Sequence, residues 1–217
     1  VDQGRPLVRV LVVDTGLGNL RSVEKALVVA AERAGMAGLE LERSSDPDRL
    51  RSADKLVFPG QGAFRDCMIA LGSGLGAALL ERIAAGTPYL GICLGLQVLF
   101  DSSAEAEGVA GLGHFGGRVE GLSPDGVKIP HMGYNQLEPV GAGHPLLRAA
   151  GGPGAWVYYV HSYHAVPSDP TLVLATSSHG PHRVTAAVGR DNVFAVQFHP
   201  EKSQDPGLAL LAAFVAS

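Results

Sequence analysis

The first half of the chain alternates between short apolar runs of strand length and longer segments with helical spacing. The apolar runs predict strands at residues 8–13, 39–42, 55–58 and 87–92. A helical segment is predicted after each of them: one to residue 32 following an N-cap at Asn19 or Ser22, one starting at residue 47, one over 63–85 with a glycine-rich interruption at 72–76, and one over 94–100. This alternation implies βαβ units, and hence an α/β fold with a mostly parallel sheet and helices on both faces.

The second half carries strand-like segments with hardly any helical pattern between them. They lie at residues 127–129, 156–160, 172–175, 183–188 and 193–197. We expect these strands to join the same sheet as antiparallel additions. The apolar segment 206–216 predicts a closing helix that packs in the core. No linker divides the chain, so we expect a single domain over residues 1–217, with residues 1–6 as a flexible N-terminal tail.

The composition excludes several classes of protein. Apolar residues make up 46% of the 217 residues and charged residues 18%, which excludes a disordered chain and a coiled coil. Seventeen basic against twenty-one acidic residues give a net charge of −4, which argues against a nucleic-acid or membrane-surface partner. Two cysteines cannot form a disulfide framework, and no apolar run approaches the ~20 residues of a membrane span. We therefore expect a soluble, cytoplasmic protein.

One of the two cysteines lies in a pattern typical of a nucleophile. The strand predicted at 87–92 runs into Cys93, which is flanked by Gly91 and Gly95 and followed by a predicted helix. Gly-x-Cys-x-Gly is the cysteine counterpart of the Gly-x-Ser-x-Gly elbow, in which a sharp turn exposes the nucleophile at a helix N-terminus. The amide of Leu94 would there face an oxyanion forming on a substrate carbonyl. The alternative is a buried structural cysteine, which is our interpretation of Cys67 in its apolar helical segment.

A cysteine nucleophile needs a base, and His199 has the most distinctive surroundings of the eight histidines. Pro200 favours an extended conformation for His199, and residues two apart in an extended segment project to the same side. Glu201 would then lie beside the imidazole and orient one ring nitrogen while the other faces the thiol. A surface His-Pro-Glu turn is the alternative for this segment taken alone.

Neither a metal nor an organic cofactor is expected. His161 and His164, like His179 and His182, are three residues apart, but neither pair is joined by a cysteine pair or a carboxylate at ligand spacing. The segment 14–19 lacks the third glycine of a dinucleotide-binding loop and the Gly-Lys-Ser/Thr of a P-loop.

Together, the cysteine and histidine motifs resemble those of a known family. Gly-Ile-Cys-Leu-Gly-Leu-Gln at 91–97 and Gln-Phe-His-Pro-Glu at 197–201 resemble the class I (triad) glutamine amidotransferases, in the same order and over nearly the whole chain. The resemblance implies a three-layer α/β fold with a mostly parallel central sheet and antiparallel additions from the C-terminal half. It also implies that Cys93 attacks the side-chain amide of L-glutamine, releasing ammonia and leaving a thioester that water hydrolyses. His199 would shuttle the protons, and Glu201 would orient His199.

The resemblance also assigns substrate-binding positions. Gln97 and Glu105 match positions that hold the substrate, and Glu105 would pair with the α-ammonium of glutamine. A solvated carboxylate at a helix end is the alternative for Glu105. The backbone of His161, Ser162 and Tyr163 would meet the α-carboxylate.

A second oxyanion donor is implied in the segment that follows the strand at 55–58. The backbone N–H of Gln61, between Gly60 and Gly62, would join that of Leu94 in stabilising the oxyanion. The family commonly has valine where this chain has Gln61, but a backbone donor survives a change of side chain.

Five segments narrow the resemblance to one branch of the family. They are Asp-Thr-Gly-Leu-Gly-Asn-Leu-Arg-Ser at 14–22, Pro-Gly-Gln-Gly-Ala-Phe at 59–64, Pro-His-Met-Gly-Tyr-Asn at 130–135, His-Ser-Tyr-His at 161–164 and His-Pro-Glu-Lys-Ser at 199–203. Together they resemble the glutaminase subunits of imidazole glycerol phosphate synthases, although Tyr134 stands where tryptophan is common. This branch implies a (β/α)8-barrel cyclase partner, which receives the ammonia through a protected channel and makes imidazole glycerol phosphate and AICAR in histidine biosynthesis.

The same resemblance places the docking face for that partner near the glutaminase site. Its expected residues are Leu17, Gly18, Asn19, Ser22 and Lys202. An ordinary helix cap and an exposed lysine are the alternatives for these positions.

Three other functions remain open from the sequence. One is a triad glutaminase that serves anthranilate or aminodeoxychorismate synthesis, and another is a stand-alone glutamine hydrolase. The third is an inactive binding subunit that keeps the fold for assembly. The presence of Cys93, His199 and Glu201 together argues against the inactive subunit.

Overall fold

The structure is a computed structural model that describes residues 7–36 and 38–217, so the tail expected at residues 1–6 lies outside the described residues. Within these residues the strands are β1 (Val8–Val13), β2 (Leu39–Ser44), β3 (Lys55–Gly60), β4 (Tyr89–Cys93), β5 (Ser102–Ser103), β6 (Gly117–Gly121), β7 (His131–Gln136), β8 (Glu138–Pro139), β9 (Trp156–His161), β10 (Tyr163–Pro167), β11 (Val173–His179), β12 (His182–Arg190) and β13 (Val193–Val196). The helices are α1 (Leu20–Arg33), α2 (Pro47–Arg51), α3 (Phe64–Leu71), α4 (Leu75–Ala84), α5 (Leu94–Gln97), α6 (Pro145–Ala149) and α7 (Gln204–Ala216), with short 3-10 turns at Pro170–Leu172 and Pro200–Lys202.

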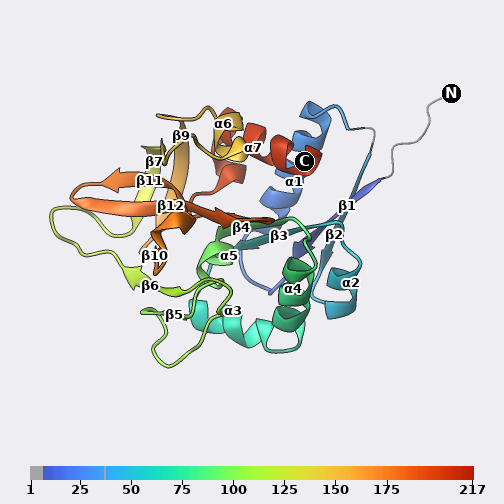
Figure 1. The fold of residues 1–217 in the computed structure, drawn as a ribbon, viewed down its shortest axis with the longest axis horizontal. Helices are drawn as coiled ribbons and strands as arrows, with labels where there is room; N and C mark the ends of the chain where they lie inside the picture. Colours follow the sequence, from blue (N-terminus) through green and yellow to red (C-terminus); the bar gives the residue numbers. More distant parts are fainter. Residues whose placement is uncertain (1–6, 37) are drawn as a thin grey trace.

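The centre of the molecule is a sheet in the strand order β2-β1-β3-β4-β13-β12-β11-β8 (Figure 1). Strands β2, β1, β3, β4 and β13 are parallel to one another, whereas β12, β11 and β8 are antiparallel additions. The predicted fold class, a mostly parallel central sheet with antiparallel strands from the C-terminal half, is therefore confirmed.

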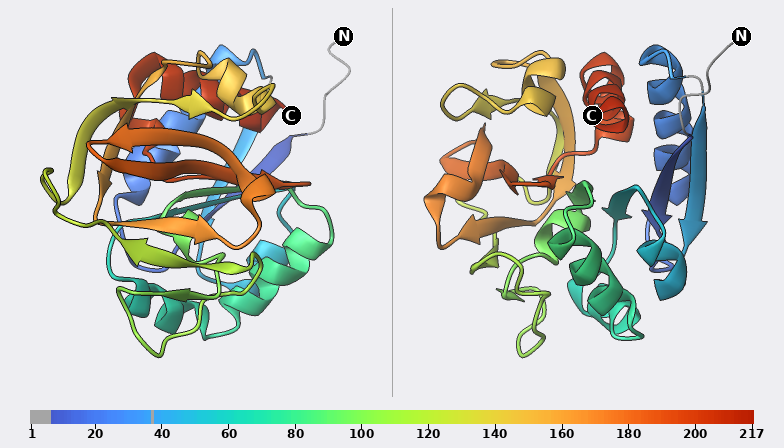
Figure 2. Two further views of the ribbon diagram at one scale, coloured as in Figure 1. Left: turned by 60° about the vertical axis from the view of Figure 1, so that its left-hand side comes forward. Right: turned by 45° about the vertical axis from the view of Figure 1, so that its right-hand side comes forward.

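Helices cover both faces of this sheet and make the three layers (Figure 2). Successive side chains of a strand point to opposite faces, so β1 contributes to two separate cores. Val10 and Val12 pack in the core under α1, α6 and α7, and Leu11 and Val13 pack in the core under α2, α3 and α4. The apolar runs of the parallel strands are continuous because both of their faces are buried.

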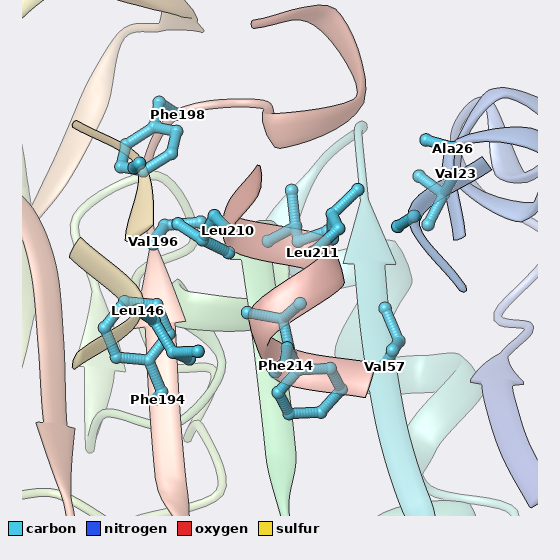
Figure 3. Close-up of a cluster of buried hydrophobic side chains, with 14 of the residues drawn as sticks. Val23, Ala26, Val57, Leu146, Phe194, Val196, Phe198, Leu210, Leu211 and Phe214 are labelled. Atoms are coloured by element: carbon cyan, nitrogen blue, oxygen red, sulfur yellow. The ribbon is translucent and has the colours of Figure 1, made fainter. Parts of the chain in front are cut away.

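The closing helix α7 lies in one of these cores, between α1 and α6 (Figure 3). Leu210, Leu211 and Phe214 point from α7 toward Phe194 and Val57 of the sheet, and all are buried. Burying an aliphatic or aromatic side chain of this size contributes about 1.5–3 kcal/mol. The prediction that this apolar helix packs in the core is confirmed.

The predicted strand at 127–129 is wrong. The chain turns there, with Gly126 at a φ of +75° and the amide of Val127 bonded to the carbonyl of Pro124. Pro130 has no N–H to offer a ladder, so pairing starts only at His131.

The expectation that every later strand joins the central sheet is also wrong. β9 pairs with β7 in a separate two-stranded sheet, and β10, β6 and β5 form a third sheet. Strands β5, β6, β7, β8 and β10 and helix α6 were not predicted. β7 shows why, because its six residues include glycine, histidine and asparagine and alternate between buried and exposed positions. The helix predicted at 94–100 ends at Gln97 and continues as a tighter turn, in which Phe100 N bonds to Gln97 O.

The parallel arrangement brings three chain segments together at one edge of the sheet. β3 ends at Gly60, β4 ends at Cys93, and β13 ends at Val196, three residues before His199. These three strands are neighbours, and the carboxyl ends of parallel strands meet at one edge. Side chains separated by about a hundred residues are therefore adjacent.

Within residues 7–36 and 38–217, no single helix has both the length and the apolar character needed to cross a membrane. Helices α3 and α4 would meet those requirements only as a pair, and they are bent at 81° to each other.

Candidate active site

Cys93 lies on a sharp turn between β4 and α5, with a φ of 54° and a ψ of −102°. This left-handed backbone is unfavourable for a residue with a side chain and persists only where the surroundings enforce it. Its two flanking glycines allow the close approach of backbone that makes the turn. A Cβ at Gly91 would lie 2.5 Å from the carbonyl oxygen of Gly95, and a Cβ at Gly95 would collide with the carbonyl oxygen of Phe58. The structure thus forms the elbow that the Gly-x-Cys-x-Gly pattern predicts.

His199 and Glu201 form a buried pair beside this turn. His199 Nδ1 lies 2.8 Å from Glu201 Oε1, and both side chains are almost fully buried. His199 Nε2 makes no hydrogen bond to a nitrogen or oxygen of the described residues and faces the thiol of Cys93. Burial alone would lower the pKa of His199, but hydrogen bonding and charge from Cys93 and Glu201 outweigh it and raise the pKa to about 10. The surroundings of His199 therefore favour its protonated form at neutral pH.

Gln197 is a site residue to which the sequence analysis gave no role. Its side-chain amide is fully buried and donates a hydrogen bond to Cys93 Sγ over 3.4 Å. Gln97 Nε2 in turn donates to Gln197 Oε1 over 3.1 Å and fixes which way that amide points. The thiol of Cys93 thus has two polar neighbours, the amide of Gln197 and the imidazole of His199.

Hydrogen bonds hold the turn that carries His199 against the strands β9 and β7. The amide of His199 donates to the carbonyl of Tyr158 over 2.9 Å. Ser203 Oγ donates to the carbonyl of His199 over 2.6 Å and accepts from the amide of Tyr158 over 2.9 Å. Tyr134 Oη, from β7, donates to the carbonyl of Lys202 over 2.8 Å. These bonds fix the position of the histidine relative to the cysteine.

The segment at 60–62 lies directly against the elbow. Gly60 is the register partner of Cys93 in the β3–β4 ladder, and a Cβ at Gly60 would lie 2.8 Å from the Cβ of Leu94. Gln61 follows it, and Gly62 has a φ of +136° that favours glycine. The segment thus places the backbone of Gln61 next to the start of α5, where the expected oxyanion donors would converge.

A cavity of about 440 Å³ opens over the cysteine. It is lined by Gln61, Gly62, Cys93, Leu94, Gln97, Glu105, Pro130, Tyr158, Val160, His161, Ser162, Tyr163 and Lys202. The candidate substrate-binding residues lie in this wall except Gly60, which packs behind it against Leu94. Pro130, Tyr158 and Val160 were not predicted to line a cavity. Pro130 begins the segment 130–135 that contributes to the family resemblance, but nothing in the sequence contexts of Tyr158 and Val160 marks them.

The two candidate substrate-binding side chains have partners of their own. Gln97 Nε2 donates both to the carbonyl of Tyr163 over 3.0 Å and to Gln197, which leaves Oε1 to meet a ligand. Glu105 Oε2 accepts from the amide of Phe64 over 3.1 Å, which holds its carboxylate at the cavity. A carboxylate there suits an ammonium group.

The candidate docking residues fall in two places. Asn19 caps α1 by accepting a hydrogen bond from the amide of Ser22, as predicted. Gly18 packs against the 60–62 segment, because a Cβ there would lie 2.9 Å from Gln61 N, and the Leu17 side chain lies close to Gly62. Lys202 lies at the cavity, with Nζ 5.7 Å from the centre of the Tyr158 ring.

Cys67 is buried in α3, and burial raises the pKa of its thiol to about 12. It therefore packs as a small apolar residue and is no nucleophile. Within the part of the chain that the structure describes, no three histidine, cysteine, aspartate or glutamate side chains are arranged to hold a metal ion.

Comparisons with known proteins agree with this geometry. The family Glutamine amidotransferase class-I matches residues 11–216. The chain is 48% identical over 214 residues to the imidazole glycerol phosphate synthase subunit HisH of Methylococcus capsulatus, with 95% of each chain covered. It is 47% identical over 211 residues to the HisH subunit of Synechococcus sp. strain JA-3-3Ab, covering 96% of this chain and 93% of that one.

Solved structures show the same fold at much lower identity. The PurLQS structure from Thermotoga maritima matches with a TM-score of 0.70 at 19% identity, covering 94% of this chain and 96% of that one. A structure described as a glutamine amidotransferase matches with a TM-score of 0.69 at 20% identity, covering 95% of this chain and 98% of that one.

Proposed function

Because the chain belongs to the class-I glutamine amidotransferase family, we propose that it hydrolyses L-glutamine to glutamate and ammonia as the glutaminase subunit of an imidazole glycerol phosphate synthase, in histidine biosynthesis. One observation carries the proposal: the strained Cys93 faces His199, whose other ring nitrogen is bonded to Glu201, at the wall of a cavity large enough for an amino acid. We propose that the chain acts as a single amidotransferase domain in the cytoplasm.

The first half of the reaction makes the thioester. His199 carries the proton at the start, and Cys93 attacks Cδ of the glutamine side chain as a thiolate. The carbonyl electron pair moves onto oxygen, where the amides of Leu94 and Gln61 would stabilise the charge. When the oxyanion collapses, the C–N bond breaks and His199 gives its proton to the leaving nitrogen. The products of this half are ammonia and a γ-glutamyl thioester.

The second half regenerates the enzyme. Water gives a proton to His199 and adds to the thioester carbonyl, and the C–S bond breaks as Cys93 leaves as a thiolate while the proton stays on His199. Glu201 orients the ring through Nδ1 during both halves. Gln197 stabilises the thiolate whenever it forms, because its amide hydrogen bond is stronger to a charged sulfur.

The cavity accounts for selection of an α-amino acid. Glu105 would bind the α-ammonium, and backbone groups of His161, Ser162 and Tyr163 would bind the α-carboxylate. Gln97 Oε1 would accept a hydrogen bond from the substrate. Both charged groups are on the α-carbon, so binding them at one end of the cavity would place the side-chain amide, at the other end of the substrate, over Cys93, which is the orientation that attack requires.

The matched relatives are subunits by name, which implies a partner for this chain. We propose that the partner is a (β/α)8-barrel cyclase that takes the ammonia. One exposed face of the β7–β9 sheet supports a docking surface at the cavity mouth. Met132 and Trp156 are 62% and 54% exposed. Val160, the cross-strand partner of Met132, and Tyr158, the cross-strand partner of Tyr134, share this face and reach the cavity. We call this surface, made by Met132, Tyr134, Trp156 and Tyr158, the aromatic face.

The proposed function is tested in the complex of this chain with its cyclase partner, by measuring synthesis of imidazole glycerol phosphate with either glutamine or ammonium as the nitrogen source. Cys93→Ala should abolish synthesis from glutamine and leave synthesis from ammonium at the level of the unaltered complex. Cys67→Ala is the matched control and should keep both. Loss of both activities in Cys93→Ala, or continued use of glutamine by it, would contradict the proposal.

A further inference from the structure

Two buried histidines whose side chains have no role in the proposed chemistry lie next to each other at the cavity, which His161 lines. His131 and His161 are register partners at the end of the β7–β9 ladder, and both are buried. His131 Nδ1 lies 3.0 Å from His161 Nε2. His161 Nδ1 lies 2.9 Å from the carbonyl oxygen of Tyr163. At the other end, Asn135 Nδ2 lies 3.2 Å from His131 Nε2.

The direction of every hydrogen bond in this row follows from its two ends. A carbonyl oxygen only accepts, so His161 must carry its hydrogen on Nδ1, and its Nε2 is then an acceptor when the ring is neutral. His131 must therefore donate from Nδ1, which leaves its own Nε2 to accept from the Asn135 amide. Asn135 Nδ2 also donates to the carbonyl of Ser178 over 2.7 Å, and its Oδ1 accepts from Gln136 N, so the amide cannot turn round without losing both bonds.

Both rings are held rigidly. His131 stacks between Tyr159, with ring centres 4.6 Å apart, and His179, with ring centres 4.1 Å apart. His179 is fixed by its own hydrogen bond from Nε2 to the carbonyl of Lys128. Burial lowers the pKa of His131 to about 4 and that of His161 to about 3, so both rings are neutral at pH 7. The hydrogen bonds therefore form a fixed chain in one direction, from the Asn135 amide through His131 and His161 to the carbonyl of Tyr163.

The last acceptor of the chain belongs to the cavity wall. The carbonyl of Tyr163 also accepts from Gln97 Nε2, so two donors from opposite directions hold one peptide group. His161, Ser162 and Tyr163 line the cavity, in the segment to which the substrate α-carboxylate is assigned.

We propose that His131 and His161 are positioning residues for glutamine, which act through a one-directional hydrogen-bond chain that fixes the backbone of residues 161–163 at the substrate carboxylate. This inference rests on the proposed function and deepens it. His131 acts on the bound substrate only through His161 and the backbone, so its loss weakens glutamine binding and leaves the chemical step at Cys93 intact.

An isosteric pair of variants at His131 tests this inference in the complex. Asn places an amide donor near the position of Nδ1, whereas Leu has nearly the same shape and no donor. His131→Leu should raise the KM for glutamine by about tenfold or more and change kcat by less than about threefold, and His131→Asn should recover most of the native KM. Leu147→Ala, a buried change in α6 away from the cavity, is the control for loss of stability and should leave KM unchanged.

The outcomes separate this inference from the proposed function. An unaltered complex without glutaminase activity would reject the proposed function itself. With an active complex, an unchanged KM in His131→Leu, a fall in kcat alone, or equal defects in the Leu and Asn variants would overturn the positioning role. Should His131→Leu not fold, the same pair at His161 takes its place, since Asn there keeps a donor for the Tyr163 carbonyl.

A second readout does not depend on activity. Nitrogen NMR of the protein labelled at histidine distinguishes the two neutral ring tautomers and the charged ring. The chain requires the Nδ1–H tautomer at both His131 and His161 at pH 7. An Nε2–H tautomer or a charged ring at either position would overturn the hydrogen-bond chain.

Discussion

The side-chain amide of Gln197 donates a hydrogen bond to Cys93 Sγ over 3.4 Å, across 104 residues of sequence. Gln197 directly follows β13, and Cys93 is the last residue of β4. Because these two strands are parallel neighbours, the sheet brings the two side chains together. The amide has a second bond, from Gln97, that prevents it from turning its oxygen to the sulfur. The cysteine therefore meets a fixed donor as well as the imidazole of His199.

Removing that donor should weaken the nucleophile. We expect Gln197→Met, which keeps the length of the side chain, to lower kcat about ten- to a hundredfold, because a hydrogen bond to a charged group contributes about 1.5–3 kcal/mol. Alkylation of Cys93 by iodoacetamide, followed against pH, should slow in parallel. An unchanged alkylation rate would show that Gln197 only fills space.

The elbow should tolerate no side chain at Gly95. A Cβ there collides with the carbonyl oxygen of Phe58, so Gly95→Ala should lower the free energy of unfolding by about 3 kcal/mol or more and abolish activity. Gly108 differs from Gly95 in having a positive φ, of +75°, and in having open space around its Cβ position. Gly108→Ala should therefore cost only about 1 kcal/mol of backbone strain. Thermal unfolding of both variants measures the contrast, and equal losses would contradict the steric account.

The neutral histidines should make the protein labile in acid. His131 and His161 stay uncharged in the fold down to pH about 4 and about 3, but in the unfolded chain they take up protons below their ordinary pKa of 6.5. The unfolded state then binds more protons, so the free energy of unfolding falls as the pH drops below 6.5. Each histidine contributes a slope of up to about 1.4 kcal/mol per pH unit in that window. The free energy of unfolding, measured with urea between pH 7 and 4, should depend less steeply on pH for His131→Asn than for the unaltered protein. An identical dependence on pH would count against buried neutral rings.

The aromatic face should contribute to partner binding. Trp156→Ala removes a large exposed ring and should weaken association with the partner subunit at least about tenfold, since a few aromatic residues dominate most interfaces. Ile69→Ala is the control, because Ile69 is a similarly exposed apolar residue, at 70%, on α3. Titration calorimetry with the separate subunits measures both, and equal affinities would place the docking surface elsewhere.

The candidate catalytic residues could be predicted from the sequence because their geometry is mostly local. Gly91 and Gly95 reveal the elbow since only glycine fits beside the crossing backbone, and the two-residue spacing of His199 and Glu201 places their side chains together. The buried strands were also recognisable, because a strand with two covered faces reads as a continuous apolar run.

The rest depended on contacts between segments far apart in sequence. Tyr158 and Val160 line the cavity only because β9 pairs with β7 outside the central sheet. The role of Gln197 depends on the order of β4 and β13, which its own neighbours do not encode. No strand forms at 127–129 despite its apolar residues, because the chain turns at Gly126 and Pro130 has no N–H to donate.

Mass spectrometry after treatment with an electrophilic glutamine analogue, a diazo ketone, is the sharpest test of Cys93 as the nucleophile toward glutamine. We expect one adduct, on Cys93, that excess glutamine prevents and that is absent from Cys67. An intact Cys93 after treatment, or an adduct that glutamine does not suppress, would contradict it.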